Sequence, residues 1–237
     1  MAVPGLQRLD GKLLDGLVFC STVYDIFDEI QGTPAGLEEL RLLTSKRAKR
    51  LMEELLPLAR YVQSRYAPGS RLRIRWVGGN QPYDAFVMGS GLEFERRPLP
   101  RREYVEVTTA AHKNDYLVRE QLHTQGLTWG GRTAARNRTT REVESEPFVY
   151  DQDERLAEHV DIVGMAIEDK AAKPYPKPVT LLVRCIFSLP VLEDEWAHIV
   201  KTLRQRERKH AFREIVLLDE VGKRCTTLSV KRFTRRR

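Results

Sequence analysis

The chain has 237 residues, of which 41% are hydrophobic and 31% are charged, and its net charge is +7. This balance excludes a disordered chain, and no apolar run approaches the roughly 20 residues of a membrane span, so we expect no membrane segment. The three cysteines lie far apart without zinc spacing, and no signal peptide is visible, which predicts a cytoplasmic location. The positive charge favours an anionic partner, nucleic acid first, although it also fits simple solubility.

The first third of the chain has a helical pattern. Residues 1–36 are predicted to form a helical N-terminal extension that ends at the break Thr33–Gly36. From 37 to 66, leucines recur at helical spacing among Glu, Lys and Arg, and Pro57 is expected to kink this helix or split it in two.

Strands and helices then alternate. Leu72, Ile74 and Trp76 alternate with arginines, which is the period of a strand. The later elements are predicted as strands at 83–88, 104–110, 179–187 and 214–219 and as helices at 114–125, 151–170 and 193–208. This order predicts an α/β fold with a central mixed β-sheet flanked by helices. The main domain spans 37–220, contains a long basic loop at 126–150 and is followed by a basic C-terminal tail at 221–237.

Two carboxylates stand out in this sheet. Asp84 opens the second predicted strand, and Glu106 lies in the third, 22 positions later. Because side chains alternate along a strand, Tyr104, Glu106 and Thr108 should face one side and Val105 and Val107 the other. Two carboxylates on neighbouring strands offer the hard oxygen ligands that Mg²⁺ prefers.

A purely structural role for both carboxylates is the alternative. Asp84 follows a turn and fits a turn residue or a cap for the loop. Glu106 in an apolar strand fits an ion pair with an arginine of a neighbouring strand, such as Arg71 or Arg73.

The segments Pro82-Tyr83-Asp84 and Glu106-Val107-Thr108, in the order helix, three strands, helix, strand, resemble the PD-(D/E)XK nuclease superfamily. The resemblance covers 37–187, with 188–219 as an extension. It implies a restriction-endonuclease-like αβββαβ core and hydrolysis of DNA phosphodiester bonds, with Mg²⁺ or Mn²⁺ held by Asp84 and Glu106. RNA as the substrate and a homodimer are also compatible with it.

The motif departs from the superfamily pattern at one position. Two residues after Glu106, where a lysine is expected, the chain has Thr108, whose hydroxyl cannot supply a fixed positive charge. Three explanations stay open: Thr108 orients the attacking water, the lysine's role has moved to Lys113 or Arg119, or the domain has lost catalysis and only binds nucleic acid or a protein. Lys113 also fits a solvated residue at a helix start. Whether the chain is an enzyme therefore stays open.

Further candidates surround this motif. Arg119 shares a helical face with Tyr116, Glu120 and His123, which fits either a phosphate contact or a solvated face. A helical acid could add a metal ligand, and the pattern does not choose among Glu38, Glu39, Glu53 and Glu54.

The basic loop is the predicted nucleic-acid contact. Trp129 could stack on a base. The loop arginines would contact backbone phosphates without reading sequence, and they are Arg132, Arg136, Arg138 and Arg141. The alternatives are a solvated loop and a disordered basic end at 231–237.

Overall fold

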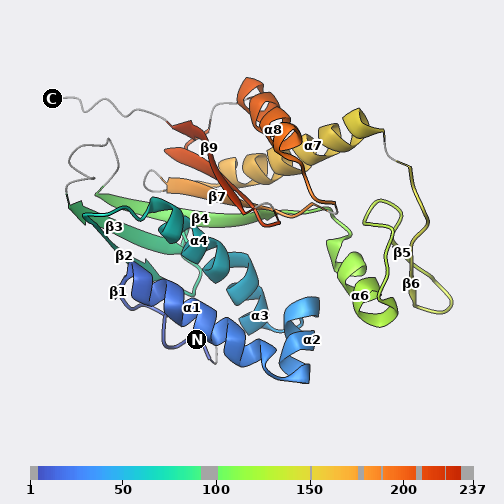
Figure 1. Cartoon of the computed structure of the whole chain (residues 1–237), viewed down its shortest axis with the longest axis horizontal. Coiled ribbons are helices and arrows are strands. Elements are labelled where there is room, and N and C mark those ends of the chain that lie inside the picture. The colour runs from blue at the N-terminus through green and yellow to red at the C-terminus, as the bar shows by residue number, and fades with distance from the viewer. Residues whose placement is uncertain are drawn as a thin grey trace.

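A computed structural model of the chain describes residues 5–91, 101–149, 151–175, 179–187, 189–206, 210–221 and 223–230. Its centre is a seven-stranded mixed sheet with helices on both faces (Figure 1), which confirms the predicted α/β class. The predicted basic end at 231–237 lies outside the described residues. No helix in the described ranges is both long and apolar enough to cross a membrane.

The strands lie side by side in chain order. From one edge to the other they are β1 (Leu14–Asp15), β2 (Ser70–Trp76), β3 (Ala85–Gly91), β4 (Arg102–Ala110), β7 (Val179–Cys185), β8 (Glu214–Asp219) and β9 (Arg224–Val230). Strands β4, β7 and β8 run parallel to one another, and all other neighbours are antiparallel. Every residue of β7 is buried, as the continuous apolar sequence of a strand covered on both faces predicts. The edge strand β9 was missed, because its residues were assigned to the tail.

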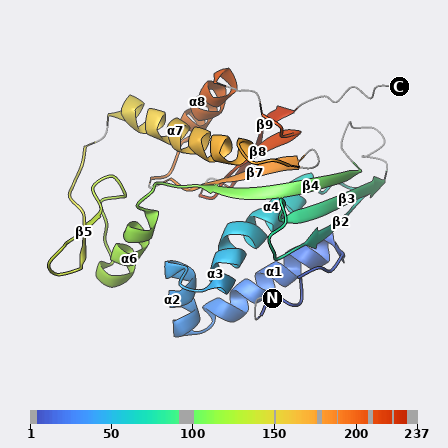
Figure 2. The same cartoon turned by 180° about the vertical axis from the view of Figure 1, so that it is seen from behind.

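Helices cover the two faces of the sheet in separate layers (Figure 2). The first layer consists of α1 (Gly16–Gln31), α2 (Pro34–Leu42), α3 (Lys46–Arg50), the π-helix η1 (Leu51–Leu55) and α4 (Leu56–Arg65). The second consists of α7 (Gln152–Ala171) and α8 (Glu193–Gln205). One apolar cluster joins the first layer to β2, β3 and β4, and another joins the second layer to β7 and β8.

Beyond the C-terminal end of β4 the chain forms a small lobe, residues 115–149. It contains α6 (Asp115–Gln125) and a short hairpin of β5 (Ala135–Arg136) and β6 (Val143–Glu144). Asn114 precedes α6 and makes no side-chain cap. Its side-chain amide instead donates to the backbone oxygens of Gly131 and Ala134, both at 3.0 Å, and so ties the loop to the start of the helix.

The N-terminal segment is part of the sheet and its first layer. Strand β1 pairs with β2, and α1 packs in the same core as α4. The side chain of Asp15 caps α1 by accepting a hydrogen bond from the Leu17 N–H at 3.0 Å. This cap explains why the helix begins here, since its first N–H groups have no partner within the helix.

The predicted helix at 37–66 is divided into several pieces. Thr33 caps α2 and Ser45 caps α3, each accepting from the N–H three residues on, at 3.1 and 3.0 Å. Pro57 is the second residue of α4 and directly follows the π-helix η1, and the backbone stays helical through this junction, since Leu55 and Leu56 both have right-handed helical angles. π-turns of this kind are frequent at functional sites, and η1 carries Glu54.

A buried polar network lies near the start of β4. The Tyr61 hydroxyl of α4 donates to Glu103 Oε1 at 2.7 Å, and the Thr180 hydroxyl of β7 donates to Glu103 Oε2 at 3.2 Å. Burial raises the pKa of Glu103. Both hydrogen bonds are needed, because a buried carboxyl without partners is costly.

Candidate functional site

Backbone hydrogen bonds hold Asp84 at the point where β3 begins. Its N–H donates to the Val105 oxygen and its own oxygen accepts from the Val77 N–H, both at 2.9 Å. Its carboxylate accepts from the Val107 N–H at 2.7 Å. Asp84 is therefore fixed between β2 and β4, and its carboxylate is anchored to the strand that carries Glu106.

Glu106 lies in the middle of β4 and is 7% exposed. Val105 and Val107 pack in the first core, whereas Tyr104 packs against the second. The predicted alternation is therefore confirmed, and Glu106 faces the layer that contains α7.

The partner of Glu106 is Lys170, in the last turn of α7. Its ammonium group pairs with Glu106 Oε1, and the two side chains are only 19% and 9% exposed. The ion pair that the structural alternative predicted with Arg71 or Arg73 is not formed. Both arginines are on β2, which is separated from β4 by β3.

A third acid, Glu54 of η1, belongs to the same electrostatic group. Its carboxylate pairs with Arg50 and accepts a hydrogen bond from Trp76 Nε1 at 3.2 Å. Burial raises the pKa of Glu54, and the negative charge of Glu106 raises it further, against the opposing effect of Arg50. Of the four helical acids that the sequence left open, Glu54 is thus the one coupled to the predicted pair.

The pKa of Asp84 is raised to about 7. Burial is the main cause, and the charges of Glu54 and Glu106 add to it, while the Val107 N–H and Lys170 oppose it. Burial and two neighbouring acids thus destabilise the charged form of Asp84, and a cation bound beside it would relieve the repulsion.

Tyr175 follows α7 and is electrostatically coupled to the same carboxylates. Burial and the charges of Glu106 and Asp84 raise the pKa of its phenol. Within the described ranges its buried hydroxyl has no hydrogen-bond partner. The site therefore has a donor available for an oxygen of a bound molecule.

The donor chemistry of the carboxylates fits a divalent metal that keeps most of its water. Across the described residues, no three or more His, Cys, Asp and Glu side chains gather into a group that could hold a metal ion. Mg²⁺ is commonly bound through one or two carboxylates, with waters and substrate phosphates completing the octahedron. Asp84 and Glu106 are the two residues that fit this mode.

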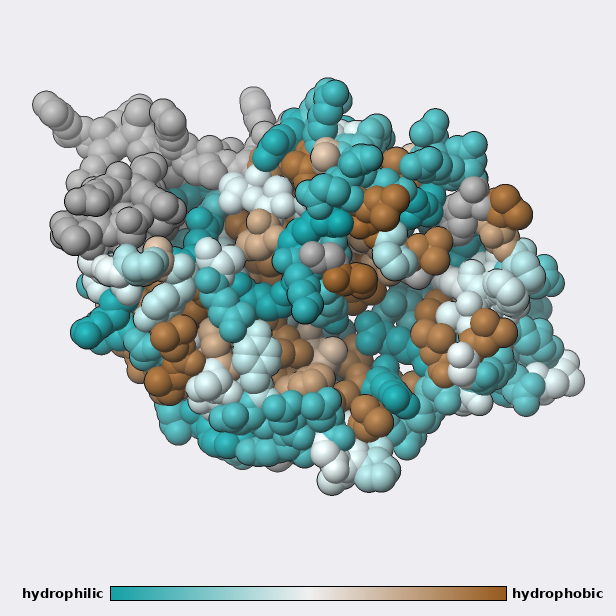
Figure 3. Space-filling view, in the orientation of Figure 1, coloured by the Kyte–Doolittle hydropathy of each residue, from teal (hydrophilic) through white to brown (hydrophobic). Residues whose placement is uncertain are grey.

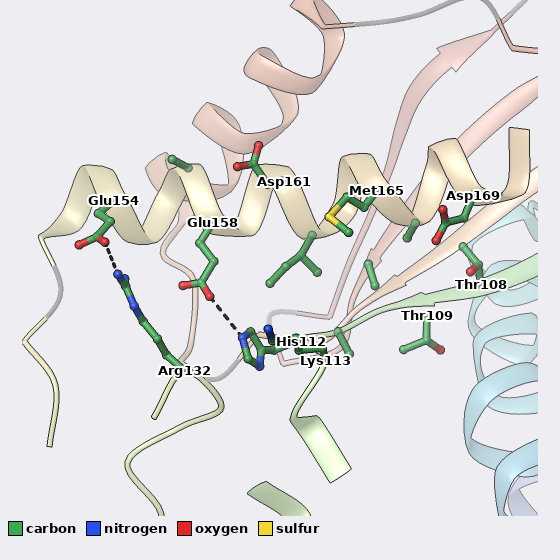
Figure 4. Close-up of a pocket in the computed structure, with 15 residues that line it drawn as sticks. Thr108, Thr109, His112, Lys113, Arg132, Glu154, Glu158, Asp161, Met165 and Asp169 are labelled. Atoms are coloured by element: carbon green, nitrogen blue, oxygen red, sulfur yellow. Dashed lines mark hydrogen bonds and ion pairs between the residues drawn. The ribbon is translucent and has the colours of Figure 1, made fainter. Parts of the chain in front are cut away.

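Thr108 and Lys113, the other predicted catalytic residues, line a neighbouring groove with a volume of about 690 Å³ (Figure 4). The groove runs between the end of β4, α7 and the loop residue Arg132. Lys113 is exposed and has no hydrogen-bond or ion-pair partner among the described residues. The lysine that contacts Glu106 is Lys170, so the predicted move of the lysine's role to Lys113 lacks support from these contacts.

The predicted face of the following helix is engaged in ion pairs. Arg119 pairs with Asp115 at 2.5 Å, and Glu120 pairs with Arg136 of the loop at the same distance. The Glu120–Arg136 pair fixes the β5–β6 hairpin to α6, whereas the Arg119–Asp115 pair lies within α6 itself, so both arginines have a structural role.

The remaining predicted loop residues differ in their contacts. Arg132 pairs with Glu154 of α7 at 2.5 Å, whereas the side chains of Arg138 and Arg141 are exposed and have no hydrogen-bond or ion-pair partner within the described segments. Trp129 is 50% exposed. The loop thus presents cations and an aromatic ring next to the groove.

Lys170, Glu54 and Tyr175 were missed or left undecided in the sequence. Lys170 is 64 positions from Glu106, and its contact depends on how α7 crosses the sheet. The sequence feature that could have indicated this contact is the position of α7 between the parallel strands β4 and β7. A helix that connects two parallel strands must pack on the sheet, so its last turn comes close to one of them.

A scan against protein-family models found no match for this chain. Comparison with curated proteins found none, and comparison with solved structures found none either.

Proposed function

We propose that the chain is a metal-dependent nuclease that hydrolyses DNA phosphodiester bonds at a site made by Asp84, Glu106 and Lys170. The observation that carries the proposal is the Lys170–Glu106 ion pair beside Asp84. It supplies a fixed positive charge at the carboxylates, which is what the PD-(D/E)XK motif obtains from the position that holds Thr108 here.

The connectivity of the sheet supports a restriction-endonuclease-like core. Taken in chain order, α4, β2, β3, β4, α7 and β7 give the helix, three strands, helix and strand of that core. The small lobe is inserted between β4 and α7, at the end of the sheet. Asp84 directly precedes β3, and Glu106 lies on β4, the strand that pairs with β3, which agrees with the resemblance.

Each residue of the site has a distinct role in this proposal. Asp84 and Glu106 would hold Mg²⁺ or Mn²⁺, which when bound polarises the scissile phosphate and lowers the pKa of a water ligand. Lys170 would stabilise negative charge that develops on the phosphate. The Tyr175 hydroxyl would donate a hydrogen bond to a phosphate oxygen. Glu54 would keep the pKa of Asp84 high, so that binding of a cation is coupled to release of a proton from Asp84.

The direct test is cleavage of plasmid and single-stranded DNA with Mg²⁺. The wild type is compared with Glu106→Gln and Asp84→Asn, which remove the charge but keep the shape. Both variants should lose at least about 100-fold in rate, since metal binding and charge stabilisation both depend on these groups. Asp25→Asn, a change at an exposed residue of α1, is the control and should retain wild-type activity. Equal cleavage by all four proteins would remove this site from consideration.

The second candidate is a nuclease-like domain that binds nucleic acid or a protein without cleaving. The observation that favours it is that Lys170 already neutralises Glu106 and no larger ligand group is present in the described ranges. Titration with Mn²⁺ separates the two functions. Mn²⁺ binding by the wild type that is lost in Asp84→Asn supports the nuclease. Absence of Mn²⁺ binding in the wild type supports the domain that binds without cleaving.

A further inference from the structure

We infer that the groove beside the carboxylate site binds a single strand of nucleic acid, with its phosphates toward Lys113 and Arg132 and its bases toward α7. This inference rests on the proposed function, because the bound strand would be the substrate of the carboxylate site. Binding of a strand in the groove can nevertheless be measured without cleavage. The groove begins next to the site, since it is lined by Thr108, two residues after Glu106, and by Asp169, the neighbour of Lys170.

The two walls of the groove differ in chemistry (Figure 4). The loop wall carries Lys113 and Arg132, two cations of the kind that contact backbone phosphates. The helix wall carries apolar side chains between its acids, including Ile162, Met165 and Ala166. Met165 is 62% exposed, so its side chain is open to contact with a bound molecule.

Two of the four acids that α7 places along the groove are paired with arginines. Arg132 pairs with Glu154. Arg206, which follows α8, pairs with Asp161 at 2.5 Å on the outer side. Glu158 and Asp169 have no lysine or arginine partner among the described residues, and Asp169 lies at the end that adjoins the proposed metal. A strand can therefore lie along the groove if its phosphates follow the loop wall.

The small lobe continues this path with exposed rings. The Arg132 guanidinium lies over the Phe148 ring, 4.3 Å from its centroid. The backbone N–H of Trp129 donates a 3.0 Å hydrogen bond to Ser145 Oγ and so holds Trp129 beside the 143–148 segment. Half of Trp129 is exposed. Tyr116 is 62% exposed on α6. Figure 3 shows apolar residues gathered among hydrophilic ones on the face of the lobe in this view. Rings next to cations are the surface on which unpaired bases stack.

The size of the groove favours one strand over a duplex. A volume of about 690 Å³ matches the roughly 300–1,000 Å³ of sites that enclose one small ligand, so it accommodates a short stretch of a single strand. In a duplex the bases are paired and stacked on one another, so they could reach neither Met165 nor Trp129. The chemistry common to single-stranded DNA and RNA is a charged backbone with accessible bases, and the groove matches that chemistry.

The test is binding of fluorescein-labelled 20-mers in EDTA, followed by anisotropy, because no cleavage is needed. Single-stranded DNA should bind at least about tenfold more tightly than the same sequence as a blunt duplex. Lys113→Ala and Trp129→Ala should each weaken single-strand binding by about tenfold, and Met165→Glu should do so as well, since it places a charge on the base wall. Lys201→Ala, an exposed lysine of α8, is the matched control and should change binding less than twofold.

The outcomes separate this inference from the proposed function. Equal affinity for duplex and single strand, or wild-type binding by both Lys113→Ala and Trp129→Ala, would overturn the groove as the strand path even if the protein cleaves DNA. Tighter binding of single-stranded DNA than of the duplex, without any Mg²⁺-dependent cleavage, would support strand binding in the groove and contradict the nuclease function. A ribo-oligonucleotide that binds more tightly than DNA would support strand binding in the groove and identify RNA as the bound strand.

Discussion

Replacing Asp84 by Asn should stabilise the metal-free protein much more at pH 8 than at pH 5. Burial and the charges of Glu54 and Glu106 raise the pKa of Asp84 from 3.8 to about 7. Between these values the folded protein keeps a proton that the unfolded chain has released, so the free energy of unfolding falls as the pH rises toward 7. Asn has no proton to lose, and its amide oxygen can still accept the Val107 N–H.

The size of this difference in stability follows from the pH range between 3.8 and about 7, in which only the folded protein keeps the proton. Only the part of this range above pH 5 contributes to the difference between pH 5 and pH 8. That part extends from pH 5 to the pKa of about 7, or about two pH units, which corresponds to a free energy of roughly 3 kcal/mol at 1.4 kcal/mol per unit. The residue is partly exposed, and solvent reduces the effect. We therefore expect the gain in stability from Asp84→Asn to be about 2 kcal/mol larger at pH 8 than at pH 5.

The assay is urea unfolding at both pH values in EDTA, with Asp25→Asn as the control. Asp25 is exposed on α1, and its replacement should shift the stability by less than about 0.5 kcal/mol at either pH. Addition of Mg²⁺ at pH 8 should stabilise the wild type and not Asp84→Asn, because a ligand that binds only the folded state raises its stability. A gain that is the same at pH 5 and pH 8 would refute this account of Asp84.

Three other changes test the buried charges. Lys170→Met should lower the free energy of unfolding at pH 7 by about 2–4 kcal/mol, since it leaves Glu106 buried and unpaired, as measured by urea unfolding. The double variant Lys170→Met with Glu106→Gln should recover at least half of that loss, and a double-mutant cycle that gives no coupling would contradict the ion pair. Tyr61→Phe should cost about 1–3 kcal/mol, because Glu103 loses its 2.7 Å hydrogen bond in the core, whereas Tyr116→Phe on the surface should cost almost nothing in the same measurement.

Much of the architecture could be predicted because the local patterns and the tertiary packing agree. The alternation of Leu72, Ile74 and Trp76 marks β2, and the apolar run at 179–185 marks a strand buried on both faces. Asp84 and Glu106 were predicted on neighbouring strands, because two short strands joined by a turn usually pair.

Other features depend on contacts between distant segments. Lys170 is one of 40 lysines and arginines, and nothing local distinguishes it from its neighbours. It reaches Glu106 only because α7 crosses the sheet above β4. Glu54 could not be chosen among the helical acids, since the π-helix η1 shifts the helical phase at that point. Strand β9 was missed because it directly precedes the basic residues at 231–237 and was assigned to the tail with them, although its threonines and valine favour a strand.

The central claim is that Lys170, rather than Lys113, supplies the positive charge of a hydrolytic site at Asp84 and Glu106. It is tested most directly by the rate of DNA cleavage with Mg²⁺ at saturating substrate for the wild type, Lys170→Met and Lys113→Met. We predict that Lys170→Met loses about 100-fold or more, while Lys113→Met stays within about tenfold because its contribution is to binding. Full activity in Lys170→Met, or a larger loss in Lys113→Met, would contradict the account.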